Sequence, residues 1–171
     1  METTDLTRRL ESERLWLEPL TVEHADEMVG VLADPALYTV IGGQPPSLDR
    51  LRERYRAQVA GSADPAEDWR NWVLRLRDGA TAIGYVQATV TAAGRTAELA
   101  WVIGTGWQRR GFATEAARRL ADALIQAGAA VLQAHVQPGH AASEEVARRI
   151  GLRPTGRCDD DGEQLWEVAR G

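Results

Sequence analysis

Three short runs of alternating apolar and polar residues in the middle of the chain constrain its fold most strongly. They span residues 71–77, 82–91 and 96–103, with Asp-Gly at 78–79 and Ala-Gly at 93–94 between them. A period of two is typical of strands that bury one face, and turns of this length join antiparallel neighbours. The sequence therefore predicts a three-stranded antiparallel meander.

Helices and further strands are predicted on both sides of the meander. A helix over 114–127 and an apolar strand over 131–136 follow it, and this strand–loop–helix–strand unit favours parallel or splayed neighbours. The other predicted elements are a strand over 14–20, helices over 21–33 and 47–60, a short helix ending at Ile150, and strands over about 153–158 and 164–169. Together they predict a single α/β domain of the α+β type.

Composition excludes several classes of protein. The chain has 171 residues and a net charge of −5, so we expect one domain and no bulk binding of nucleic acid. No apolar run is long enough to span a bilayer, and the N-terminus does not resemble a secretory signal. Cys158 is the single cysteine and lysine is absent, which excludes a disulfide framework, a cysteine-rich metal site and Schiff-base chemistry. We expect a cytoplasmic protein that binds neither a membrane nor a metal.

The segment between the meander and the helix over 114–127 is suited to an anion. A loop that ends at a helix N-terminus presents backbone N–H groups without partners, together with the positive end of the helix dipole. The glycine of this loop lets a bulky anion reach the backbone, and two arginines add fixed charge. The arrangement suits a pyrophosphate. The residues concerned are Gln108, Arg109, Arg110, Gly111, Phe112, Ala113 and Thr114.

The spacing Gln-x-x-Gly-x-Ala in this loop resembles the coenzyme A loop of the GNAT superfamily, the acetyl-CoA-dependent N-acyltransferases. Other residues extend the resemblance over nearly the whole chain. The segment Glu-Arg-Leu-x-Leu-x-Pro-Leu at 13–20 looks like the start of one branch of this superfamily. That branch acetylates amino acids, some antibiotics and protein N-termini, among them those of ribosomal proteins. Gly84, Trp107 and the Ile-Gly-Leu at 150–152 also match the family pattern.

This resemblance implies a particular architecture. It predicts a mixed, mostly antiparallel sheet of six to seven strands, flanked by about four helices and splayed between its fourth and fifth strands. The splay would admit the pantetheine arm of coenzyme A. The domain would cover residues 13–170 and follow an N-terminal extension over residues 1–12.

The resemblance also implies a reaction, in which an acetyl group passes directly from acetyl-CoA to a primary amine of a small molecule or a peptide N-terminus. Glu98 is the leading candidate for the general base, acting directly or through a water molecule. The backbone N–H of Ile103 is the candidate donor to the thioester oxygen. A solvent-facing or ion-paired glutamate is the alternative for Glu98. For the whole chain the alternative is a non-catalytic acyl-CoA sensor, and either a monomer or a homodimer fits the resemblance.

Further site residues are implied by position. Besides the loop, the coenzyme would contact Val102, Ile103, His140 and Ser143, and the acceptor would contact Tyr38, Trp69, His135 and Asp160. Two positions depart from the family pattern. His140 stands where the family usually has asparagine, and Ala147 stands where many members have a tyrosine that protonates the departing thiolate. The general acid is therefore unassigned.

Overall fold

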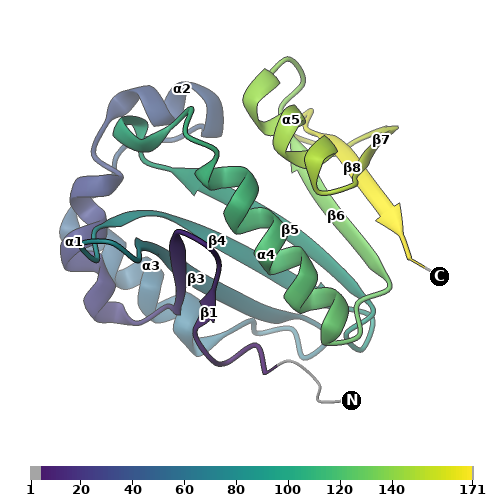
Figure 1. Ribbon diagram of the computed structural model, residues 1–171, viewed down its shortest axis with the longest axis horizontal. Coiled ribbons are helices and arrows are strands. Elements are labelled where there is room, and N and C mark those ends of the chain that lie inside the picture. Colours follow the sequence, from purple (N-terminus) through teal and green to yellow (C-terminus); the bar gives the residue numbers. More distant parts are fainter. Residues whose placement is uncertain (1–4, 171) are drawn as a thin grey trace.

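The computed structural model describes residues 5–170, which form an eight-stranded sheet with helices on both faces (Figure 1). In spatial order the strands are β1 (Leu10–Glu11), β2 (Leu15–Pro19), β3 (Asp68–Leu76), β4 (Ala82–Thr91), β5 (Thr96–Ile103), β6 (Val131–Val136), β8 (Gln164–Ala169) and β7 (Arg153–Cys158). The α-helices are α1 (Ala25–Val31), α2 (Tyr38–Ile41), α3 (Leu48–Ala60), α4 (Phe112–Gln126) and α5 (Ala141–Arg149). Short 3-10 helices are η1 (Val22–His24), η2 (Pro35–Leu37) and η3 (Thr105–Trp107).

Neighbouring strands of the sheet run antiparallel except at one place, where β5 and β6 run parallel. The β5–β6 pairing extends from Thr96 opposite Val131 only as far as Glu98 opposite Gln133. Both strands continue beyond these residues, so they diverge toward their C-terminal ends. The predicted splay, between the fourth and fifth strands of the predicted sheet, is confirmed.

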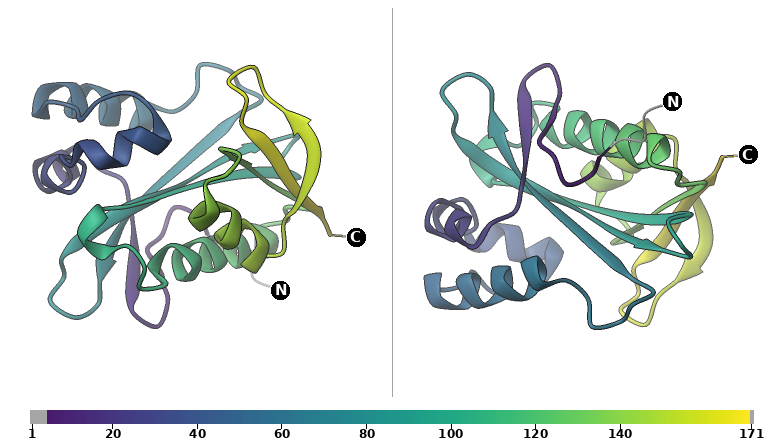
Figure 2. Two further views of the ribbon diagram at one scale, coloured as in Figure 1. Left: turned by 90° about the horizontal axis from the view of Figure 1, so that it is seen from above. Right: turned by 90° about the horizontal axis from the view of Figure 1, so that it is seen from below.

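Two layers of helices enclose the sheet, as Figure 2 shows. Helices α1, α2 and α3 cover one face, and α4 and α5 cover the other. Each face has its own core: Ile83, Leu99 and Leu120 belong to the core under α4, whereas Val73 and Val102 belong to the core under α1 and α3. Side chains at alternate positions of β5 therefore point to opposite layers. This alternation explains the period of two in the sequence.

Gly84 occupies a position in β4 where no other residue fits. A Cβ atom built there would lie 2.2 Å from the carbonyl oxygen of Val102 on β5, far inside van der Waals contact. The register between β3 and β4 also shifts next to this position, between Leu74 and Arg75. A glycine in a strand commonly marks such a bulge or close approach.

The fold class is the predicted one, and the differences concern single elements. The sheet has eight strands rather than six to seven, because Leu10–Glu11 pair with β2 inside the stretch predicted as an N-terminal extension. The described residues contain five α-helices rather than about four, since Tyr38–Ile41 also form one turn of helix. Helix α4 begins at Phe112 rather than Thr114. Within residues 5–170, no helix is long and apolar enough to cross a membrane.

Candidate active site

Two cavities lie where β5 and β6 diverge, and they share part of their lining. The first, of about 190 Å³, lies between the end of β5, the loop that follows it, α2, α4 and α5. The second, of about 200 Å³, also reaches β4, β6 and the turn before β8. Six of the residues predicted to contact the coenzyme line the first cavity: Val102, Ile103, Gln108, Ala113, His140 and Ser143. The structure therefore brings together residues that are up to 41 positions apart in the sequence.

The backbone of β5 presents hydrogen-bonding groups to this divergence. Just before β5, the carbonyl of Arg95 accepts a hydrogen bond from the N–H of Ala130 at 2.8 Å, on the β6 side. Just after β5, the N–H of Gly104 donates to the carbonyl of Ile83 on β4 at 2.8 Å. Backbone groups alternate in direction along a strand. Those of odd-numbered β5 residues therefore face β6, and those of even-numbered residues face β4.

This alternation places Ile103 and Val102 in different roles. The N–H of Ile103 faces the diverging strands, and its carbonyl accepts a hydrogen bond from Nε2 of Gln108 at 3.0 Å. The backbone groups of Val102 face β4, so this residue lines the cavity with its side chain. Gln108 thus fixes the end of β5 by its side chain.

The loop before α4 has the shape of an anion site. Arg109 and Gly111 have φ angles of 64° and 80°, in the left-handed region, and Gly111 is the N-cap of α4. No side chain caps this helix, so the N–H groups of its first turn keep no partner from a cap. The side chain of Phe112 is buried in the core, and the guanidinium of Arg110 lies 5.2 Å from the ring of Trp107. Backbone amides and positive charge are therefore the groups that this loop offers.

Arg14 lies in the motif at 13–20, which by itself indicates no role for this side chain, and it holds the loop in place. Its Nε donates to Glu115 at 2.7 Å, its Nη1 donates to the carbonyl of Arg110 at 3.0 Å, and its guanidinium lies 4.1 Å from the ring of Phe112. Glu115 also accepts from the hydroxyl of Ser12 at 2.6 Å. Burial by itself would raise the pKa of Glu115, but the hydrogen bonds from Ser12 and Arg14 outweigh it and lower the pKa. The loop is thus tied to the start of β2.

A third cavity, of about 400 Å³, lies on the outer side of the same loop. Gly111 and Thr114 line it from the loop and the first turn of α4. Four arginines that come from three separate parts of the chain also line it: Arg14, Arg118, Arg119 and Arg149. The carboxylates of Glu13, Glu115 and Asp122 line it too, so the cavity beside the amides of α4 carries a small excess of positive charge.

Glu98 and His135 form a hydrogen-bonded pair across β5 and β6. Nδ1 of His135 lies 2.7 Å from Oε1 of Glu98. His135 lines the second cavity, together with Glu163 from the turn before β8. Burial, followed by the nearby charge of Asp159, raises the pKa of Glu163. One end of this cavity therefore combines an imidazole with acidic groups.

The four residues predicted to contact the acceptor do not all meet. His135 lines the second cavity, but the hydroxyl of Tyr38 donates to the Leu32 carbonyl at 2.8 Å. Trp69 lies on β3, where its Nε1 donates to Glu67 at 3.1 Å and its ring lines a separate cavity. Asp160 is exposed in the turn after β7. Another residue of the same acidic turn, Glu163, lines the cavity instead, and the sequence alone offered no means to choose between them.

Comparison with known proteins shows the family of this chain. The family described as Acetyltransferase (GNAT) domain matches residues 14–153, which is most of the chain. The chain therefore belongs to the GNAT acetyltransferase family. It is 29% identical over 100 residues to YnaD of Bacillus subtilis (strain 168), an uncharacterized N-acetyltransferase, and this match covers 54% of the chain and 56% of YnaD. The chain thus spans about half the length of this curated relative.

Solved structures share the fold over almost the whole chain. An acetyltransferase from Agrobacterium tumefaciens is 26% identical, with a TM-score of 0.73 over 95% of this chain and 94% of that one. RimL, a ribosomal alpha-N-protein acetyltransferase in complex with coenzyme A, is 13% identical, with a TM-score of 0.80 over 95% of this chain and 98% of RimL. The similarity to RimL is one of fold.

Proposed function

We propose that this protein transfers an acetyl group from acetyl-CoA to a primary amine while both substrates are bound together. The observation that carries the proposal is the grouping of three features around connected cavities. These are the N–H of Ile103 at the end of β5, the uncapped start of α4, and the Glu98–His135 pair. They match the needs of the reaction for a donor to the thioester oxygen, a site for the coenzyme diphosphate and an acceptor for the amine proton.

The residues present fit coenzyme A. Val102, Ile103, Gln108, Ala113, His140 and Ser143 hold the pantetheine arm in the cavity beside β5. The diphosphate lies on the backbone amides of residues 109–114, where Gly111 has a φ of 80° and leaves the backbone open. The arginines of the third cavity add positive charge close by. Bound acetyl-CoA supplies the acetyl group as a thioester.

The side chains at the divergence then carry out the proton transfer. His135 accepts a proton from the amine, and its Nδ1–H donates to Glu98, which leaves Nε2 as the atom that accepts. As the nitrogen–carbon bond forms, the N–H of Ile103 donates to the carbonyl oxygen, where negative charge develops. The carbon–sulfur bond breaks and the sulfur leaves as the coenzyme A thiolate. Glu98, the residue predicted to be the base, acts through His135 in this proposal.

Steady-state release of the coenzyme thiol tests the proposal. We expect wild-type protein to release thiol from acetyl-CoA in the presence of members of a panel of primary amines, with the acetylated amine detected by mass spectrometry. Calorimetric titration with coenzyme A checks that the coenzyme site is intact. Tight coenzyme binding without turnover of any amine would contradict the proposal and point to a protein that binds acyl-CoA without catalysis.

A further inference from the structure

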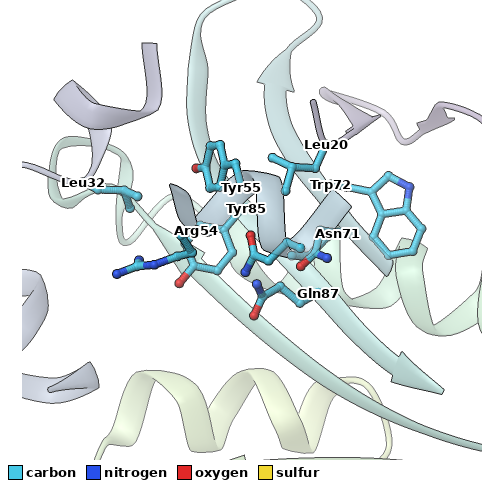
Figure 3. Close-up of a pocket in the computed structure, with 10 residues that line it drawn as sticks. Leu20, Leu32, Arg54, Tyr55, Asn71, Trp72, Tyr85 and Gln87 are labelled. Atoms are coloured by element: carbon cyan, nitrogen blue, oxygen red, sulfur yellow. The ribbon is translucent and has the colours of Figure 1, made fainter. Parts of the chain in front are cut away.

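The face of the sheet under α3 carries a polar cavity that the reaction described above does not use. Its volume is about 210 Å³, and α3 contributes Arg54, Tyr55 and Gln58 to it. From the sheet, Asn71 of β3 and Gln87 of β4 face this cavity, as Figure 3 shows. Of the described residues that line it, Arg54 is the single charged one. A ligand held here meets one cation and several amides.

The polar groups of this cavity are free to bind a ligand. The side-chain amides of Gln58, Asn71 and Gln87 take part in no hydrogen bond within residues 5–170. In the same part of the chain, no carboxylate forms an ion pair with Arg54, which is exposed at the rim, whereas Arg52 on the same helix pairs with Asp26 at 2.7 Å. Amides and a guanidinium without partners are ready donors for a polar, anionic ligand.

This cavity adjoins the one that contains His135. Tyr85 lines both of them. In the sheet, Asn71 lies opposite Gln87, and Gln87 lies opposite Ala100, which is exposed and lines the cavity with His135. Ala100 presents only a methyl group at this position. Asn71, Gln87 and Ala100 form one row on the sheet, here called the floor, which runs from β3 under α3 to β5 beside the cavity of His135.

The two ends of this floor carry opposite charges. Glu98 and Glu163 lie at the end with His135, and Arg54 lies at the other end. Burial raises the pKa of Tyr85, so its hydroxyl stays protonated and can donate to an anion. An amine at the acidic end and an anion at the basic end would both be favoured by this polarity.

The sheet geometry sets the span between β6, which carries His135, and β4, whose Gln87 lines the same cavity as Arg54. Neighbouring strands lie about 4.8 Å apart, so β4 and β6 are separated by roughly 10 Å or slightly more, because β5 and β6 diverge. An extended peptide advances about 3.5 Å per residue, so a free tripeptide places its carboxylate about 10 Å from its amine. The amine and carboxylate of a single amino acid are much closer together than this span.

We propose that the acceptor of this enzyme is a primary amine that carries a carboxylate about 10 Å away, as a short peptide does, with the carboxylate held by Arg54. The inference rests on the proposed acetyl transfer. One carboxylate matches the one cation of the cavity, and the amides of Gln58, Asn71 and Gln87 match the peptide groups between the two ends.

Paired acceptors test the inference. The free acid of trialanine and its C-terminal amide differ in one charge at the far end. We expect wild-type enzyme to acetylate the acid with a kcat/KM about tenfold higher, which is the low end of what a hydrogen bond to a charged group contributes. Arg54→Gln should remove this preference by lowering kcat/KM for the acid alone. Arg56→Gln, a matched change on the same helix outside the cavity, should preserve the preference.

The outcomes separate this inference from the proposed function. Equal use of the acid and the amide by wild type, or an equal loss with both in Arg54→Gln, would overturn the carboxylate site and leave acetyl transfer intact. If neither peptide is acetylated, calorimetric titration of both into enzyme saturated with coenzyme A decides. Tighter binding of the acid, lost in Arg54→Gln, supports the site, and equal or absent binding overturns it.

Discussion

Nδ1 of His135 lies 2.7 Å from the carboxylate of Glu98, which belongs to the last residue pair that joins β5 to β6. If His135 accepts the amine proton, His135→Ala should lower kcat about 100-fold, the low end for loss of a general base, with little change in the KM for acetyl-CoA. Imidazole added to the medium should restore part of the rate, because the cavity left by the substitution is open. Rescue is a result that a purely structural role of His135 would not produce.

A milder loss is expected when the partner of His135 is changed. Glu98→Gln keeps a hydrogen-bond acceptor but removes the charge that favours the proton on Nδ1, so kcat should fall by about tenfold and the melting temperature should stay close to that of wild type. Gln133→Ala is the matched control, because Gln133 lies on the same face of β6 and bonds to Glu167 at 2.6 Å. Similar kinetics for Glu98→Gln and Gln133→Ala would argue against a positioning role.

Much of this fold could be predicted because its signals are local. The meander follows from alternation within single strands, and the loop before α4 follows from six consecutive residues. The start of α4 was predicted at Thr114, a good capping residue type, but Gly111 takes the cap position because its φ of 80° turns the chain into the helix there. The two-residue strand β1 is too short for any period to show.

The candidate site was predictable only where it depends on one segment. Arg14 bonds to Glu115 across 101 positions, and the motif at 13–20 that contains Arg14 does not indicate this partner. The choice of Arg54 among the arginines of α3 depends on which turn of the helix faces the sheet. Such roles arise from tertiary packing, which a single sequence does not specify.

Substitution of Gly111 should separate coenzyme binding from folding. In Gly111→Val, a β-branched residue must adopt a φ near 80°, which costs about 1–2 kcal/mol of stability, and its side chain covers the amides of the loop. We expect the acetyl-CoA KM and the calorimetric Kd for coenzyme A to rise at least tenfold. Gly94→Val is the control, because Gly94 has a φ of 87° in a turn away from the site. It should lose similar stability and keep its coenzyme affinity.

Substitution of Arg14 should loosen the loop before α4, although Arg14 itself lies outside that loop. Arg14→Ala breaks the bonds to Glu115 and to the Arg110 carbonyl, so the backbone amides must be ordered when the coenzyme binds. That ordering should weaken coenzyme A binding by about tenfold in calorimetry. Arg9→Ala removes a guanidinium that lies 4.6 Å from the ring of Trp16 and serves as the control. Unchanged affinity in Arg14→Ala would show that the loop keeps its shape without this contact.

The pH dependence of stability should differ in sign between two glutamates. Burial would raise the pKa of Glu115, but hydrogen bonds from Ser12 and Arg14 lower it below its ordinary 4.5. This carboxylate therefore stabilises the fold above that pH, and the stabilisation is lost as pH falls through the folded pKa. The unfolding free energy of wild type minus that of Glu115→Gln, from denaturant titrations, should decrease toward acid. For Glu163, whose pKa is raised by burial and by Asp159, the corresponding difference should instead decrease as pH rises through the folded pKa. Parallel curves for Glu115→Gln and wild type would show that the bonds from Ser12 and Arg14 do not hold its charge.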